Sequence, residues 1–263
     1  MAELKYDSTA AAGYERAFAH VSSHFLPYLL RAGGVASGHH VLDIATGTGL
    51  LAQAALAAVG PSGQVTAADL SPDMIERARE RLAGAPNVSV RVEDGQALSF
   101  PDESFDTVLC SLGLMFFPDP ARGLAEFRRV LRRGGRAAVS VNTVPERSYN
   151  TRLHVIIARY VPSRAAMASR LFSLGSETRL RQLFEGAGFR DIEVSTEAHQ
   201  FSAPSFAHYF EQIERGWGSA GEAFVSLPEK IQHAVREDIR HELGDTGGAI
   251  KVPVEFRFVS GRK

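Results

Sequence analysis

The chain has 263 residues, of which 44% are hydrophobic and 22% charged, and its formal net charge is −1. This is the composition of an ordinary globular protein, and the near-zero charge gives no general attraction to nucleic acid or to an anionic membrane. No apolar run is long enough to span a bilayer, and the single cysteine, Cys110, excludes an intrachain disulfide and a thiolate-rich metal site. The first residues lack the pattern of a secretion signal, so we expect a cytoplasmic protein.

Hydrophobic periodicity predicts that helices and strands alternate along most of the chain. Apolar residues at helical spacing predict a first helix over residues 10–31, which ends at Gly33 and Gly34. Apolar runs then predict seven strands, over residues 40–44, 64–68, 87–92, 105–110, 136–141, 189–194 and 250–259. Helical patterns between them occupy residues 48–59, 72–83, 120–131 and 176–187. This order predicts an α/β fold, a Rossmann-like, seven-stranded and mostly parallel sheet with helices on both faces.

Three helical stretches add to this core. They are the N-terminal helix, an irregular region at 145–175, and residues 204–243, which predict two helices broken by glycines at 216, 218 and 221. We therefore expect a single domain over residues 1–263. Its core covers about 35–143, 176–200 and 249–263, and the additions cover about 1–32, 145–175 and 204–243.

The segment Val41–Gly49 has the strongest pattern in the chain. It predicts a buried strand that ends in a glycine-rich turn and leads directly into a helix, which is a cradle for a nucleotide-like ligand. The run from Gly47 to Ala52 fits G-x-G-x-x-A, and Asp69 follows Gly49 by twenty residues. A dinucleotide-binding protein has about that spacing, so NAD is one possible ligand.

Charge at the strand ends favours a different ligand. Asp43, Asp69 and Asp94 each lie at or just after the carboxyl end of a predicted strand, and in a doubly wound sheet these ends meet at one crevice. Three carboxylates there would repel a pyrophosphate, whereas they would attract the sulfonium and ammonium groups of S-adenosyl-L-methionine. The ligand's own carboxylate could bind the amides at the helix start near Thr48. The alternative is that these aspartates only cap a turn and a helix.

The same segments carry a family resemblance. Val41–Gly49 resembles the first motif of class I S-adenosylmethionine-dependent methyltransferases, and three later segments match in order and spacing: Asp69–Met74, Glu93–Pro101 and Ser104–Val108. Together they resemble the branch of the ubiquinone and menaquinone biosynthesis methyltransferases, with a type 11-like domain. The resemblance implies that the last strand is antiparallel and that the three helical additions form a lid over the crevice.

The resemblance and the charge pattern together assign roles to the site residues. Asp43 is expected to face the methionine ammonium group, Asp69 to accept both ribose hydroxyls, and Asp94, with the amides of Gly95 and Gln96, to bind the adenine edge. The full set of expected cofactor-binding residues is Tyr14, Asp43, Gly47, Gly49, Asp69, Leu70, Met74, Asp94, Gly95, Gln96 and Ser111. Leu70, Met74 and Tyr14 could equally be ordinary packing residues.

Histidines are the candidates for a catalytic base. Methyl transfer from a sulfonium needs no strong acid or base, but a phenol or enol acceptor would benefit from one. His20 and His24 share one face of the first helix, and His154 lies in the first insertion. The pair at i, i+4 could also hold a metal, but no acidic residue lies between them, so we expect no metal site.

Apolar residues suggest the acceptor. The segment Gly113–Pro118 is apolar and follows the fourth strand, and the insertions add several aromatic residues. We therefore expect a small organic acceptor such as a quinol, a polyketide, a terpenoid or another secondary metabolite. The arginines of residues 147–170 leave open an anionic acceptor. Two other functions remain open, a non-methylating reaction such as cyclisation, and a non-catalytic cofactor-binding subunit. The sequence does not indicate the oligomeric state.

Overall fold

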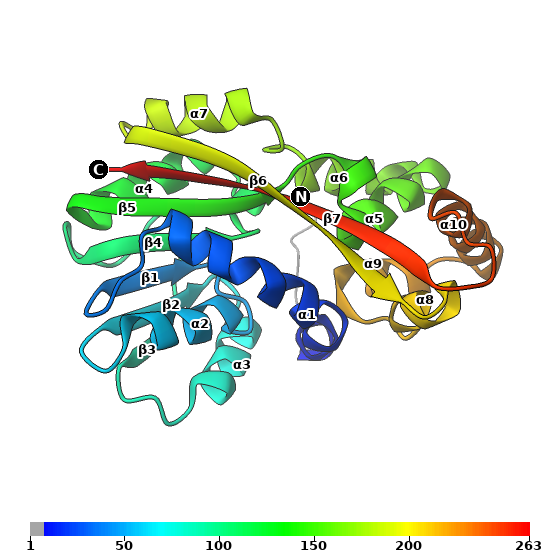
Figure 1. Ribbon diagram of the computed structural model, residues 1–263, viewed down its shortest axis with the longest axis horizontal. Helices are drawn as coiled ribbons and strands as arrows, with labels where there is room; N and C mark the ends of the chain where they lie inside the picture. The colour runs from blue at the N-terminus through cyan, green and yellow to red at the C-terminus, as the bar shows by residue number, and fades with distance from the viewer. Residues whose placement is uncertain (1–7) are drawn as a thin grey trace.

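The protein is described here from a computed structural model, which covers residues 8–263 and the side chains of residues 20–149 and 151–263. Seven strands form one sheet in the order β3-β2-β1-β4-β5-β7-β6 (Figure 1). The strands are β1 (His40–Ile44), β2 (Gln64–Asp69), β3 (Val88–Val92), β4 (Phe105–Ser111), β5 (Leu131–Asn142), β6 (Arg190–Ala203) and β7 (Ile250–Arg262). Strand β7 runs antiparallel to both of its neighbours, and β1 to β5 pair in parallel. The predicted fold class is confirmed.

Ten α-helices accompany the sheet within the part of the chain that the structure describes. They are α1 (Ser8–Ala32), α2 (Leu50–Val59), α3 (Pro72–Leu82), α4 (Pro120–Val130), α5 (Tyr149–Tyr160), α6 (Ala165–Leu171), α7 (Glu177–Gly186), α8 (Phe206–Glu214), α9 (Gly218–Val225) and α10 (Glu229–Glu242). Local chemistry explains where several of them begin. Ser71 caps α3 with its side chain and Pro72 takes the first helical position, as predicted.

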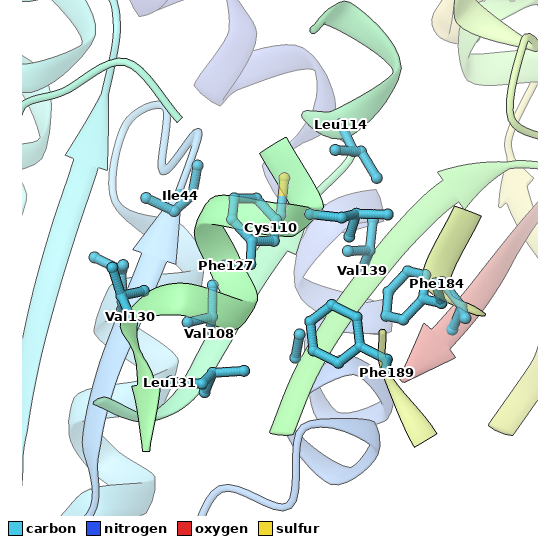
Figure 2. Close-up of a cluster of buried hydrophobic side chains, with 14 of the residues drawn as sticks. Ile44, Val108, Cys110, Leu114, Phe127, Val130, Leu131, Val139, Phe184 and Phe189 are labelled. Carbon is cyan, nitrogen blue, oxygen red and sulfur yellow. The ribbon is translucent and has the colours of Figure 1, made fainter. Parts of the chain in front are cut away.

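The sheet is covered on both faces. On one face, apolar side chains of α1, α2 and α3 pack on the strands, with Phe25 and Leu29 of α1 fully enclosed against β7 residues such as Phe256. On the other face, α4 and α7 supply Phe127 and Phe184 (Figure 2). Burial of this apolar surface, at about 25 cal/mol per Å², is the main stabilising term of the core. It also fixes the strand ends that carry the site.

Strands β6 and β7 are longer than the sequence predicts. We expected the sixth strand to end at Val194, but β6 continues to Ala203 and pairs with β7 down to Ile250. Helices α5, α8, α9 and α10 pack around the far end of this two-stranded ribbon and form a third apolar cluster with Val252 (Figure 1). We call these four helices the outer cluster. Residues 195–203 show no clear alternating pattern, because none of them is buried and both faces of this part of β6 are open to solvent.

The region 204–243 holds three helices where the sequence predicted two. Gly216, at φ +74°, ends α8 as expected. Gly221 does not break a helix; it lies inside α9, where a Cβ would come 2.6 Å from the backbone of Gly216, so only glycine lets the two segments pack. The break that the sequence missed lies at Ser226–Pro228, where Pro228 starts α10.

Candidate cofactor and acceptor site

The turn after β1 has a backbone built for close approach of a ligand. Ala45, Gly47 and Gly49 all have positive φ, at 56°, 56° and 85°. A Cβ on Gly47 would meet no atom within 4 Å, so glycine is required there by backbone conformation and not by crowding. Ala45 has no such freedom, and strained residues of this kind persist where the surrounding structure enforces them, often at functional sites.

Asp43 lies near the end of β1, just before this turn, and is fully buried. Its Oδ2 accepts a hydrogen bond from the Thr46 hydroxyl at 2.6 Å, while its Oδ1 has no partner. Burial raises the pKa of Asp43 from 3.8 to about 7. The Thr46 hydrogen bond opposes this rise, the nearby Asp69 adds to it, and the Ala52 backbone amide makes the smallest contribution, which lowers the pKa. The Thr48 hydroxyl is also buried and unpaired. Two buried oxygens without partners beside a glycine turn indicate a site for a polar, cationic ligand.

Asp69 at the end of β2 holds the turn in shape. Its Oδ2 accepts from the Gly47 amide and its Oδ1 from the Ser71 amide, both at 2.9 Å. Burial raises the pKa of this carboxyl, and the backbone hydrogen bonds act against the rise. Since each carboxylate oxygen has a second lone pair, Asp69 can still accept hydroxyl groups from a ligand.

The Asp69→Ala variant is therefore expected to bind S-adenosylhomocysteine more weakly by about 1–3 kcal/mol, because a charged hydrogen-bond acceptor and the support of the turn are both lost. Isothermal titration calorimetry measures the change. Asp73→Ala, on the exposed first turn of α3, is the control and should bind as the wild type does. Equal affinity of Asp69→Ala and wild type would remove Asp69 from the site.

Some of the residues expected to hold adenine are already buried or hydrogen-bonded within the protein, and others are exposed. Leu70 is 67% exposed, an unusual state for a leucine, whereas Met74 is buried. Asp94 is exposed and its Oδ1 accepts from the Gln96 amide at 2.9 Å. The Gln96 side chain in turn accepts from the Asp119 amide at 2.8 Å, so it anchors the start of α4. The Gln96 amide is thus already bonded within the loop, while Leu70 and Asp94 remain open to a ligand.

The loop after β4 interlocks with the turn after β1. A Cβ on Gly113 would lie 2.4 Å from the Cβ of Ala45, so this glycine is required by close packing. Leu112 also has positive φ, at 53°, and its amide donates to the Ser140 carbonyl at 3.0 Å. The hydroxyl oxygen of Ser111 lies 3.3 Å from the hydroxyl oxygen of Ser140 on β5. Ser111 is among the residues predicted from the sequence and Ser140 is not, although a serine between Val139 and Val141 was a usable signal.

The structure joins His20 and His24 to the edge strand of the sheet. The ring of His24 lies 3.9 Å, centroid to centroid, from that of His199 on β6, and both helix histidines contact Phe201. Burial lowers the pKa of each, and His199 lowers that of His24 further. These contacts connect α1 to β6 and do not bring either imidazole to Asp43 or Asp69.

His154 is buried inside the outer cluster. Its Nε2 lies 3.3 Å from the Ser219 hydroxyl of α9, and burial, followed by the charge of Arg164, lowers its pKa from 6.5 to about 4. It is therefore neutral near pH 7 and a weak base.

The side chain of Tyr14 lies outside the described residues. No group of three or more potential metal ligands occurs among the described residues, and no described helix is long and apolar enough to cross a membrane.

Comparisons with known proteins agree with this geometry. A family profile described as a methyltransferase domain matches residues 41–135. The chain is 33% identical over 177 residues to the ubiquinone/menaquinone biosynthesis C-methyltransferase UbiE of Saccharophagus degradans. The aligned residues cover 62% of this chain and 71% of that relative.

Solved structures share the fold, and two of them are described here. Phosphoethanolamine N-methyltransferase 2 of Haemonchus contortus, in complex with S-adenosyl-L-methionine, has a TM-score of 0.64 and 20% identity, over 99% of this chain and 58% of that one. The [4+2]-cyclase SpnF has a TM-score of 0.58 and 17% identity, over 92% of this chain and 80% of that one. With the profile, the UbiE relative and the strand-end aspartates in agreement, the chain belongs to the class I S-adenosylmethionine-dependent methyltransferases.

Proposed function

We propose that this methyltransferase transfers a methyl group from S-adenosyl-L-methionine to a small, largely apolar organic acceptor, and that it does so as a single domain. The observation that carries the cofactor site is the buried Asp43 carboxylate, which has one unpaired oxygen beside a turn of positive-φ residues. An unpaired buried carboxylate is costly unless a cation meets it, and the ammonium group of the methionine part is such a cation. A dinucleotide would place its phosphates against this carboxylate and would be repelled by it, so we do not propose NAD as the ligand.

The site residues divide the work of binding. Asp43 meets the ammonium group, Asp69 accepts the ribose hydroxyls, and Leu70, Met74 and Asp94 hold the adenine ring. The backbone amide of Thr48 faces the carboxylate of the methionine part, because the Gly47 amide already donates to Asp69. The bound cofactor supplies a methyl group already activated on a sulfonium. The protein's contribution is then to place the acceptor in line with it and to exclude water.

The acceptor side is supported by the loop that follows β4. Leu114 and Met115 form a buried apolar wall there, next to Leu112 and close to the turn after β1. The name of the UbiE relative, a ubiquinone/menaquinone biosynthesis C-methyltransferase, supports a quinone-related acceptor. We propose a quinol, polyketide, terpenoid or similar metabolite as the acceptor, and the outer cluster as the lid that encloses it.

The test uses the wild-type chain with S-adenosyl-L-methionine carrying an isotopically labelled methyl group and a panel of quinols and phenolic metabolites. Label should appear in one class of organic product, together with an equal amount of S-adenosylhomocysteine. Binding of S-adenosylhomocysteine without any labelled product would contradict the proposed reaction. An unlabelled rearranged product would point to the non-methylating alternative. The chain shares its fold with a cyclase, but a shared fold alone does not favour that alternative, because one fold can host different reactions.

A further inference from the structure

Two buried polar side chains at the end of β5 have no role in the cofactor site described above. Asn142 is 2% exposed and Thr143 is 3% exposed, and both keep a polar atom without a partner, the Asn142 Oδ1 and the Thr143 Oγ1. The other two unpaired buried side-chain atoms among the described residues belong to Asp43 and Thr48 in the cofactor turn. Unpaired buried polar atoms are costly and rare, so a second pair of them calls for a partner.

The Asn142 amide is held in one orientation. Its Nδ2 donates to the Leu171 carbonyl of α6 at 3.1 Å and lies 3.7 Å from the sulfur of Met115. A carbonyl oxygen can only accept, so the nitrogen must be the atom that faces it. The Oδ1 is therefore fixed as a free hydrogen-bond acceptor. A partner for it must be a donor, such as a hydroxyl group.

The pair lies where an acceptor is expected. Asn142 follows Ser140 by two residues on β5, and Ser140 contacts Ser111 at the end of β4. Met115, which contacts the Asn142 amide, belongs to the apolar wall of the proposed acceptor site. The Asn142 side chain therefore lies beside this apolar wall, close to the end of β4.

The backbone around Thr143 is tightly fixed. A Cβ on Gly175, between α6 and α7, would lie 2.0 Å from the Thr143 carbonyl oxygen, and the Gly175 carbonyl accepts from Arg257 of β7. This packing holds the end of β5 rigid. A preorganised acceptor of hydrogen bonds discriminates strongly between ligands with and without a matching donor, since a mismatched ligand leaves it unpaired.

We infer that Asn142 and Thr143 form a polar subsite that binds a hydroxyl group of the methyl acceptor. The acceptor is then a hydroxylated aromatic or similarly apolar molecule, and the subsite fixes its orientation. The inference rests on the proposed function, because only that function makes the bound molecule a methyl acceptor. Binding of a hydroxyl group by these two residues can be tested separately. Asn142 and Thr143 are specificity-determining residues in this account.

The experiment compares two probes, 1-naphthol and 1-methoxynaphthalene, which share a ring system and differ in the hydroxyl donor. Their affinities are measured by fluorescence titration of the full chain saturated with S-adenosylhomocysteine. The wild type should prefer 1-naphthol by at least about tenfold. Thr143→Val should lower the preference several-fold, and Asn142→Leu should remove it.

Folding of the variants is checked by thermal unfolding. Thr143→Val replaces an unpaired hydroxyl with a methyl of the same shape, so its melting temperature should equal or exceed that of the wild type. The matched control is Thr107→Val, since Thr107 is buried but has hydrogen-bond partners at 3.4 Å in Gly33 and His39. That variant should melt lower and keep the preference for 1-naphthol.

Three results would overturn the inference: binding of neither probe, equal binding of both by the wild type, or a preference that Thr143→Val and Asn142→Leu leave unchanged. A buried water bonded to both residues would give the last of these, together with a lower melting temperature for Thr143→Val. Failure of the proposed function is a separate result, namely absence of labelled product from the wild type whatever the probes do.

Discussion

Replacing Asp43 with asparagine should make the ligand-free protein more stable above pH 7, by up to about 4 kcal/mol. The carboxyl has a folded pKa of about 7 against an ordinary value of 3.8, because burial disfavours its charged form. The folded state therefore holds this proton more tightly, and the stability that results is present at low pH and is lost as pH rises from about 4 through 7. Asparagine keeps the shape and carries no charge, so its stability should not follow that slope.

Urea unfolding from pH 5 to pH 8 measures this difference. Asp191→Asn is the control, since Asp191 is exposed and has a positive φ of 48°, which asparagine tolerates well. It should change stability by less than about 0.5 kcal/mol at every pH. If Asp43→Asn loses stability at pH 8, the carboxylate has a structural partner that the geometry does not reveal.

The same variant should bind the cofactor poorly. In the wild type a cation next to Asp43 favours the ionised form, so binding should release a proton and weaken by up to about tenfold for each pH unit below 7. Calorimetric titration with S-adenosylhomocysteine in buffers of different ionisation enthalpy measures the number of protons released on binding. Asp43→Asn should show no proton release. The site thus gives up stability for binding, as functional sites often do.

Acid should destabilise the outer cluster through His154. Its folded pKa of about 4 lies below the ordinary 6.5, so the unfolded chain takes up a proton that the folded chain refuses. The stability that comes from the neutral imidazole is present above pH 6.5 and is lost as pH falls toward 4. Between pH 7 and pH 5 the loss is about 2 kcal/mol.

His154→Gln should remove this loss while its amide can still meet Ser219. Because Asp43 changes stability in the opposite direction over the same range, the measurement is the difference between variant and wild type at each pH. His233→Gln on α10 is the control, since His233 is exposed and its replacement should leave the acid slope unchanged. A slope that survives in His154→Gln would show that another group is responsible.

Local patterns predicted much of the fold. The strand from His40 to Ile44 and the cap at Ser71 follow from neighbouring residues alone, so the sequence sufficed for them. The length of β6 depends on pairing with β7, more than forty residues away, which no local pattern records. Gly221 was misread for the same reason, since its role depends on Gly216 after the chain folds back.

The site shows the same limit. Asp43 and Asp69 could be predicted because charge and spacing are visible in the sequence, and in the structure both lie beside one turn. Asn142 and Thr143 were not, because an unpaired oxygen can be recognised only when its surroundings are known. The histidines were chosen by residue type, and only three-dimensional contacts assign His24 to β6 and His154 to the outer cluster.

The long ribbon of β6 and β7 has an evolutionary consequence. The residues that we propose to bind the cofactor lie at or just after the carboxyl ends of β1, β2 and β3. The outer cluster is built on the far ends of β6 and β7, at the other end of the strand order. Changes of sequence or length in the outer cluster therefore leave the cofactor turn intact. A lineage can acquire new acceptors by varying one half of the molecule while the other half continues to supply the same methyl group.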